Sequence, residues 1–198
     1  MKKIVLLSFI IGLVGCSSNP IDLPSNIKTI PTGMGNSTYI DEIDKSFQLS
    51  TDVSFEKIKA CSVDVITNDS VVLRDSAGSF VGVYTGNYYQ NKNSSVVQGG
   101  NLFKYVDDSG KSLVASGRIK TNPQQGGLIV DIVQYDAKIS LNKNNINLKF
   151  QNIKAAQENT GGTSNVGFRN IGTWSGARAP AAISAIDQVA TKFKNCVN

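Results

Sequence analysis

The most regular feature of the sequence is an alternation of apolar and polar residues in its last third. From Val133 to Leu141 every second residue is apolar, and the residues between them are Gln, Asp, Lys and Ser. The alternation resumes from Ile146 to Phe150, after the turn-like segment Asn142-Lys143-Asn144-Asn145. Because successive side chains of a strand point to opposite faces, this pattern predicts an antiparallel hairpin with one buried face and one face in water.

Two shorter hairpins are predicted upstream of this one. Residues 71–73 and 80–84 are mostly apolar and flank Asp75-Ser76-Ala77-Gly78. Residues 102–106 and 113–114 flank Asp107-Asp108-Ser109-Gly110 in the same way. Asp, Ser and Gly are residue types that tight turns favour. Several hairpins in succession predict a meandering antiparallel sheet.

Apolar residues at helical spacing predict one helix before this sheet region and one after it. The first covers residues 52–65, with Asp52 or Ser54 as the cap and Cys61 on the apolar side. The second covers residues 180–196 and has Pro180 in its first turn. We therefore predict an α+β fold in which both helices pack on one face of an antiparallel meandering sheet.

Two segments lack such periodicity. Residues 16–46 contain three prolines, two glycines and many Ser and Asn residues, which predicts a flexible tether ahead of a single α+β domain at 47–198. Residues 161–179 are rich in Gly, Ser and Asn, and loops of this length are uncommon unless they are functional or disordered. The side chains that make this loop a candidate binding loop are Phe168, Arg169, Trp174 and Arg178.

The first residues predict a secretory signal. Two lysines precede an apolar run, residues 4–14, that is too short to span a membrane. The residues Leu13-Val14-Gly15-Cys16 resemble the lipobox of bacterial lipoproteins. The resemblance implies that residues 1–15 are a signal peptide, that cleavage follows Gly15, and that Cys16 carries the lipid. Within this class, Ser17 after the cysteine favours the outer membrane; an ordinary secretory signal with a chance cysteine is the alternative.

The assignment of Cys16 to lipid leaves two further cysteines, Cys61 and Cys196, in an oxidising compartment. We expect these two to form a disulfide between the two predicted helices. Two buried free thiols are the alternative. A zinc site is disfavoured, because two cysteines without any histidine lack the usual ligand set.

The arrangement of elements also resembles a known family. A helix at 54–65, several strands, the hairpin of residues 135–141 and 146–153, and a closing helix are similar to an uncharacterised family of bacterial envelope proteins with a TATA-binding-protein-like fold. The resemblance spans Phe47 to Val197. It implies the fold alone, because that family has no assigned activity or catalytic residues.

Composition narrows the range of partners. The formal net charge is +5, from 20 Lys and Arg and 15 Asp and Glu, and it falls to about +3 without Lys2 and Lys3. The basic residues are spread along the sequence and form no run with interleaved aromatics, so nucleic acid is not an expected partner. Attraction to anionic peptidoglycan or lipid head groups is compatible with this charge.

The sequence presents no catalytic constellation. It has no histidine, which excludes Ser-His-Asp and Cys-His nucleophile systems. Ser54-Phe55-Glu56-Lys57 matches the S-x-x-K of penicillin-binding enzymes but lacks the companion motifs, so we interpret Ser54 as a helix cap. We interpret Asp107-Asp108 as turn residues rather than a paired-carboxylate site. We expect no catalytic residue, cofactor or metal.

These observations favour a lipid-anchored, non-enzymatic binding or accessory module of the bacterial cell envelope. The membrane would be reached through the lipid on Cys16, and an envelope protein or peptidoglycan is the candidate partner. Two alternatives remain open. One is a cell-wall hydrolase that uses carboxylates alone, and the other is an inhibitor or immunity-type lipoprotein that inserts the loop at 161–179 into its target.

Overall fold

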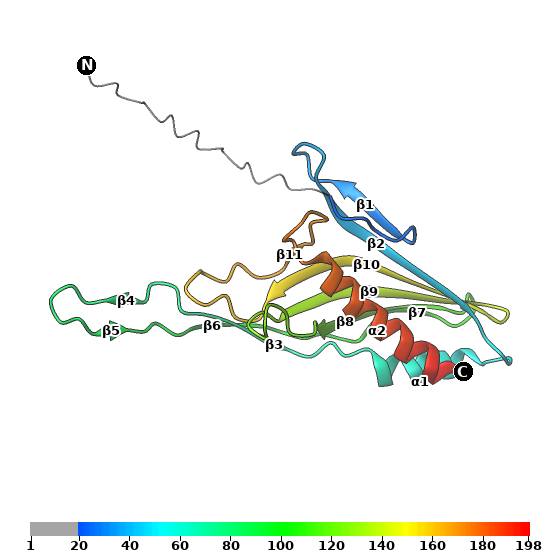
Figure 1. Ribbon diagram of the computed structural model, residues 1–198. Coiled ribbons are helices and arrows are strands. Elements are labelled where there is room, and N and C mark those ends of the chain that lie inside the picture. The colour runs from blue at the N-terminus through cyan, green and yellow to red at the C-terminus, as the bar shows by residue number, and fades with distance from the viewer. Residues whose placement is uncertain (1–19) are drawn as a thin grey trace, which may run out of the picture.

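The two alternating segments form the hairpin at the centre of the main sheet (Figure 1). The computed structural model describes residues 20–198, so the predicted signal peptide with Gly15 and Cys16 lies outside the described residues. Strand β9 (Asp131–Asn142) pairs with β10 (Asn145–Gln157), starting where Asn142 faces Asn145. The apolar positions of β9 are buried, which confirms the prediction for Val133, Tyr135, Ala137, Ile139 and Leu141.

The main sheet has seven strands, and every pairing in it is antiparallel. The second predicted hairpin is confirmed as β7 (Phe103–Asp107) and β8 (Ser112–Lys120). The strand order is β1-β2-β10-β9-β8-β7, and β11 also pairs with β10. The remaining strands of the sheet are β1 (Ile27–Pro31), β2 (Thr38–Gln48) and β11 (Arg169–Asn170).

The predicted tether at 16–46 is wrong for residues 27–46, because these residues form β1 and most of β2. Strand β2 lies beside β10 in the sheet, where Ile43 faces Phe150 and both side chains are fully buried. A bulge hides this strand in the sequence. Asp41 is an extra residue opposite the β1 register shift, so the buried Ile40 and Ile43 are three positions apart and break the period-two pattern.

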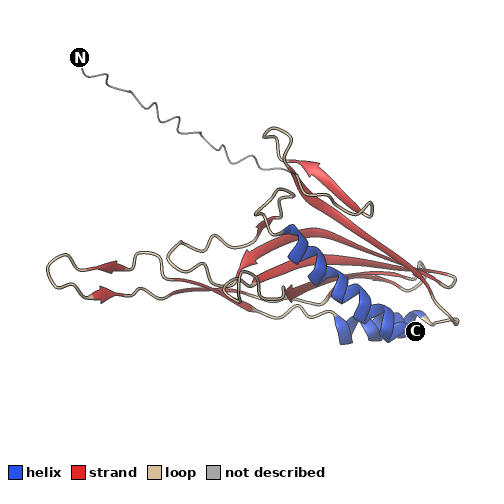
Figure 2. Cartoon of the chain, viewed as in Figure 1, coloured by secondary structure: helices blue, strands red, loops and turns tan. Residues whose placement is uncertain are grey.

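Both predicted helices are present, and they pack on the same face of the main sheet (Figure 2). They are α1 (Phe55–Val65) and α2 (Ala179–Val197). Ser54 is the cap of α1, as predicted, because its Oγ accepts a hydrogen bond from the Lys57 N–H at 3.2 Å. The antiparallel sheet and the two helices together confirm the predicted α+β fold. Within residues 20–198 no helix is long and apolar enough to cross a membrane.

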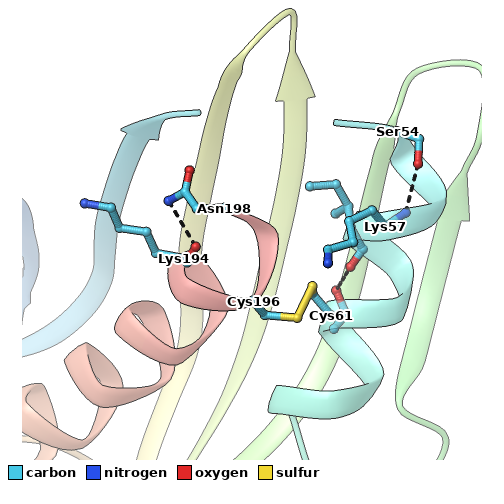
Figure 3. Close-up of a disulfide and its surroundings, with 8 residues drawn as sticks. Ser54, Lys57, Cys61, Lys194, Cys196 and Asn198 are labelled. Carbon is cyan, nitrogen blue, oxygen red and sulfur yellow. Dashed lines mark hydrogen bonds between the residues drawn. A yellow bond between two sulfur atoms is a disulfide. The ribbon is translucent and has the colours of Figure 1, made fainter. Parts of the chain in front are cut away.

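The expected disulfide joins the two helices (Figure 3). Cys61 of α1 and Cys196 of α2 are bonded, and their Cα atoms are 5.7 Å apart, a usual separation for a disulfide. Cys61 is 1% exposed and belongs to the hydrophobic core. The bridge therefore fixes α1 to α2 across 135 residues of sequence.

The first predicted hairpin is wrong, because its two segments pair with other strands and not with each other. Strand β3 (Val71–Asp75) pairs with β6 (Asn93–Val97), and β4 (Phe80–Val81) pairs with β5 (Tyr88–Tyr89). Together they form a longer two-stranded arm that projects from the body in Figure 1. The segment after Asp75 bends the arm without reversing it, because the Asn93 side chain donates hydrogen bonds to Asp75 Oδ1 and to Ala77 O. The reversal occurs further on, at Gly86.

Candidate functional site

The face of the main sheet that lies away from the helices is polar. We call this surface the open face. Strand β9 presents four polar side chains on it, Gln134, Asp136, Lys138 and Ser140. The base of the arm covers one end of the open face through a small apolar cluster of Leu73, Ile132 and Ala156. The arm is therefore packed on the same side of the sheet as these polar residues.

Asp136 lies in the middle of the open face and accepts hydrogen bonds from three other strands. Its donors are Ser116 Oγ at 2.8 Å, Lys104 Nζ at 2.8 Å and Asn152 Nδ2 at 2.7 Å. The register of β7 shifts around Lys104, and the register of β10 shifts around Asn152, which has a φ of 53°. Bulges of this kind redirect side chains, and here both direct a donor at one carboxylate.

The side chain of Asp136 is 13% exposed. Burial raises the pKa of this carboxyl, but hydrogen bonds from Lys104, Asn152 and Ser116 outweigh it and hold the pKa below its ordinary value. Asp136 is therefore an anion at neutral pH. Lys104 is its cationic partner among the described residues.

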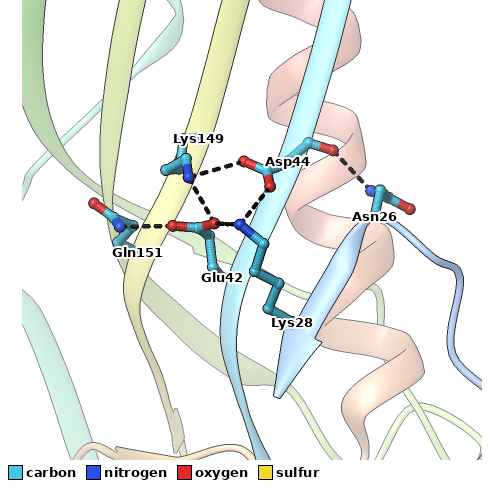
Figure 4. A network of polar contacts seen from close by, with 6 residues as sticks. All are labelled: Asn26, Lys28, Glu42, Asp44, Lys149 and Gln151. Atoms are coloured by element: carbon cyan, nitrogen blue, oxygen red, sulfur yellow. Dashed lines mark hydrogen bonds and ion pairs between the residues drawn. The ribbon is translucent and has the colours of Figure 1, made fainter. Parts of the chain in front are cut away.

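A second network is centred on Glu42 (Figure 4). Its side chain is 8% exposed and accepts from Lys28 at 2.5 Å, from Lys149 at 2.6 Å and from Gln151 at 2.7 Å. Both lysines also pair with Asp44. The hydrogen bonds from Lys149 and Lys28 outweigh burial and lower the pKa of Glu42 to about 2. Glu42 is therefore unsuited to donate a proton near neutral pH.

Two polar cavities lie next to each other on the open face. The first has a volume of about 330 Å³ and lies between the Asp136 network and the base of the arm, lined by residues that include Asn68, Gln98, Lys104, Arg118, Asn152 and Lys154. The second has a volume of about 540 Å³ and is lined by residues that include Lys138, Ser140, Asn147, Lys149 and Gln151. Volumes in this range are typical of small-molecule sites.

The open face also holds the excess positive charge of the described chain. Residues 20–198 contain 18 Lys and Arg and 15 Asp and Glu, once Lys2 and Lys3 are set aside. The basic side chains on the open face, by strand register and ion pairing, are Lys28, Lys104, Arg118, Lys120, Lys138, Lys149 and Lys154. The acidic ones are Glu42, Asp44, Asp136 and Glu158. Charges that are spread along the sequence are thus gathered on one surface by the fold.

Three of these cations have no carboxylate within ion-pair distance in residues 20–198: Arg118, Lys138 and Lys154. The Arg118 guanidinium instead donates to the main-chain oxygens of Asp69 and Gln98 at 2.7 and 2.9 Å. It thereby holds the base of the arm against β8. Burial lowers the pKa of Arg118 from its ordinary value.

The predicted binding loop at 161–179 does not form one surface. Phe168 is half-buried and packs beside the Leu73, Ile132 and Ala156 cluster. Arg169 is exposed in β11, and together with Arg178 it lines a small cavity of about 230 Å³. The loop is tied to the sheet by β11 and by a bridge between Tyr39 and Gly172.

The other two residues of that loop have structural contacts. Arg178 forms a bidentate pair with Asp131, at 2.7 and 2.8 Å, and the Asp131 side chain is 4% exposed. Trp174 packs against Tyr39 with ring centroids 5.9 Å apart. Sequence reasoning selected the loop for its composition and overlooked the open face, whose residues are the polar half of the alternation in β9 and β10.

The Asp107-Asp108 pair is confirmed as part of a turn. Asp107 accepts hydrogen bonds from the Gly110 N–H and from Ser109 Oγ, and these lower the pKa of its carboxyl. Asp108 points elsewhere and pairs with Lys59 of α1 at 2.8 Å. The two carboxylates do not converge on a common site.

Comparisons with known proteins do not assign a family. No family model matches the chain, and no curated protein matches it. Among solved structures, the chain is similar to a DUF4468 family protein from Bacteroides ovatus, with 9% sequence identity, 80% of each chain covered and a TM-score of 0.37. The lipobox and the TATA-binding-protein-like fold stay predictions from the sequence.

Proposed function

We propose that this chain is a lipid-anchored, non-enzymatic binding module of the bacterial outer membrane, and that its open face binds an anionic glycan such as peptidoglycan. The observation that carries this proposal is that Lys138 and Lys154, which have no carboxylate partner among residues 20–198, lie beside two polar cavities. Carboxylates on a ligand supply the counter-charges that the described residues do not provide.

The layout of the cavities favours an elongated ligand. On β9 the first cavity includes Gln134 and Asp136, and the second includes Lys138 and Ser140. At a rise of about 3.3 Å per residue, this stretch of strand is roughly 20 Å long. The amide and hydroxyl groups along it are suited to the hydroxyl groups of a sugar chain.

The cell-envelope part of the proposal rests on the sequence. The Leu13-Val14-Gly15-Cys16 motif resembles a lipobox, and a pair of acyl chains gives stable anchoring where one chain does not. The disulfide between Cys61 and Cys196 fits an oxidising compartment.

The non-enzymatic part is supported by the state of the carboxylates on the open face. Glu42 and Asp44 are close to each other, but Lys28 and Lys149 bridge both of them. A general acid needs a pKa near the working pH, whereas that of Glu42 is about 2. Glu42 is therefore unsuited to the general-acid role that the paired-carboxylate chemistry of the hydrolase alternative requires.

Co-sedimentation with purified peptidoglycan sacculi tests the proposal. The wild-type chain is compared with a variant that carries both Lys138→Gln and Lys154→Gln. Each removed ion pair is expected to contribute about 0.5 to 1 kcal/mol, so the dissociation constant should rise about tenfold. Binding of the wild type should weaken as salt is added, because screening reduces the attraction.

A matched control removes two positive charges from the helix side of the molecule, with Lys57→Gln and Lys194→Gln. Both control lysines are exposed and lie outside the open face. This variant should sediment like the wild type. Equal losses in the two variants would contradict a site on the open face. Soluble glycan fragments that accumulate during the incubation would contradict a non-enzymatic role and favour the hydrolase.

One observation favours the inhibitor or immunity-type alternative, and it concerns the arm rather than the loop at 161–179. The tip of the arm exposes large apolar side chains, among them Phe80, Val83, Tyr84 and Tyr88. Projecting aromatic residues are typical of protein-binding surfaces. Recovery of a protein partner by the wild type but not by a Tyr84→Ser, Tyr88→Ser variant, without any binding to sacculi, would favour this alternative.

A further inference from the structure

Residues 170–177 meet two segments from the start of the described chain, residues 20–21 and 29–40. Pro20 pairs with Trp174 in an isolated bridge, and the Ile21 N–H donates to Thr173 O at 2.8 Å. Tyr39 of β2 pairs with Gly172 beside them. We call this region the apex and define it as residues 20–21, 29–40 and 170–177. In Figure 1 the turn between β1 and β2 and strand β11 lie together at this end.

The apex is uncharged and exposes two large apolar side chains. None of its residues is Asp, Glu, Lys or Arg, in a chain of which 18% is charged. Ile30 is 41% exposed and Met34 is 72% exposed, whereas Tyr39 and Trp174 are half-buried against each other. Tyr and Trp are enriched where proteins meet the boundary between lipid and water, because their rings are apolar and carry one polar group.

The position of the apex along the chain is what connects it to a membrane. Pro20 is the fourth residue after Cys16, so the two Cα atoms can be at most about 14 Å apart even in a fully extended chain. The predicted tether would have placed the domain far from its anchor, but β1 and β2 belong to the sheet. A lipid on Cys16 would therefore hold the apex close to the bilayer surface.

We infer that the apex is the surface of this protein that contacts the lipid bilayer, with Trp174, Tyr39 and Met34 at the level of the head groups. The inference rests on the lipid anchor of the proposed function. This contact would orient the domain. The apex would face the membrane that carries the anchor, and the open face would lie next to the apex. The exposed aromatic tip of the arm has no such link to the anchor.

Trp174 is the single tryptophan of the chain, so its fluorescence reports the apex alone. The lipidated full chain is reconstituted into phosphatidylcholine vesicles with or without bromine on the upper part of the acyl chains. Trp174 emission should fall in the brominated vesicles, because an indole ring at the level of the head groups lies near the upper acyl chains and bromine quenches tryptophan only at short range. Intact-mass measurement of the same sample establishes whether Cys16 carries lipid.

Two variants locate the contact. In a Trp174→Phe background, Tyr84→Trp places the fluorophore at the tip of the arm, and it should not be quenched. Met34→Glu adds a charge to the apex at an exposed turn and should reduce the quenching of Trp174, whereas Val83→Glu, at the 95% exposed Val83 of the arm, should leave it unchanged.

The outcomes separate this inference from the proposed function. A lipidated chain whose Trp174 is not quenched would overturn the inference and leave the anchor standing. Quenching at the tip of the arm but not at the apex would also overturn it, since the arm would then be the membrane contact. A chain without lipid on Cys16 would remove the anchor and the inference together.

Discussion

The two faces of the β9–β10 hairpin are built from the same strands but differ in what holds them together. On the helix side, Ile139, Leu148 and Phe150 are at most 1% exposed and pack under α2. On the open side, Asp136 and Glu42 are held by hydrogen bonds and ion pairs from neighbouring strands. Burial of apolar area contributes most of the stability of a fold, whereas a hydrogen bond to a charged group contributes about 1.5 to 3 kcal/mol. The helix side therefore supplies most of the stability, and the open side is available to a ligand.

The largest expected effect on the helix side comes from the disulfide. The variant with Cys61→Ser and Cys196→Ser should lose about 5 kcal/mol of unfolding free energy in the chain-entropy model, because the bridge closes a loop of 135 residues. Urea denaturation of the wild type and the variant measures this difference. Dithiothreitol should lower the stability of the wild type by a similar amount and leave the variant unchanged. A loss below about 1 kcal/mol would show that the helices hold each other without the bridge.

The next largest loss of stability is expected from the ion pair between Arg178 and Asp131. Arg178→Met leaves the buried Asp131 carboxylate without its cation, and only the hydrogen bond from the Gln124 side chain remains. The loss of one partner from a buried ion pair costs about 3 to 5 kcal/mol. Thermal or urea unfolding should show this loss. Arg169→Met is the control, because Arg169 is exposed and should change stability by less than about 0.5 kcal/mol.

If Arg178→Met unfolds like the control, the pair with Asp131 is not structural, and the earlier interpretation of Arg178 as a binding residue regains support. Sacculus binding by the Arg178→Met variant then decides between the two roles. An unchanged stability together with weaker binding would move the ligand site from the open face toward the cavity that Arg169 and Arg178 line.

Two adjacent residues of β9 allow a direct comparison of the faces. Ile139→Ala removes a fully buried side chain under the helices and should cost about 3 kcal/mol. Lys138→Ala removes an exposed side chain from the open face and should change stability by less than about 0.5 kcal/mol. Urea unfolding of both variants provides the measurement. Similar losses at the two positions would contradict the division of roles between the faces.

The parts of the structure that the sequence predicts well are those with local signals. Alternation between Val133 and Leu141 predicts both the β9 strand and its buried face, since side-chain direction in a strand depends only on parity. The cap at Ser54 also follows from residue type and spacing. For the strand and the cap a short stretch of chain contains enough information. The pairing of Cys61 with Cys196, 135 residues apart, follows instead by elimination once Cys16 is assigned to lipid.

The parts that sequence reasoning missed depend on contacts between distant segments. The extra residue Asp41 interrupts the pattern of β2, so only its pairing with β10 identifies it as a strand. The bulges that direct Lys104 and Asn152 at Asp136 have no mark in the sequence. The residues of the open face therefore come together only when the strands pair. Sequence reasoning selected the loop at 161–179 instead, because that loop is rich in Gly, Ser and Asn.

The smallest expected effect concerns the open face and depends on pH. Glu42→Gln removes the carboxylate that Lys28, Lys149 and Gln151 share, and loss of hydrogen bonds to a charged group should cost about 1 to 3 kcal/mol at pH 7. The pKa of Glu42 is lowered from 4.5 to about 2 in the folded protein. Between these values the unfolded chain binds the proton more readily, so the contribution of Glu42 is complete above about pH 4.5 and is lost as the pH falls toward 2.

The difference in unfolding free energy between wild type and Glu42→Gln should thus shrink as the pH is lowered. Urea midpoints at pH 7, 4 and 3 measure it, and the difference isolates Glu42 from Asp136 and other carboxylates with lowered pKa values, which titrate in both proteins. Glu56→Gln is the control: its 79% exposed side chain pairs with Lys59, and such surface pairs contribute less than about 1 kcal/mol. If the difference in unfolding free energy between wild type and Glu42→Gln stays constant down to pH 3, the negative charge of Glu42 is not what stabilises this network.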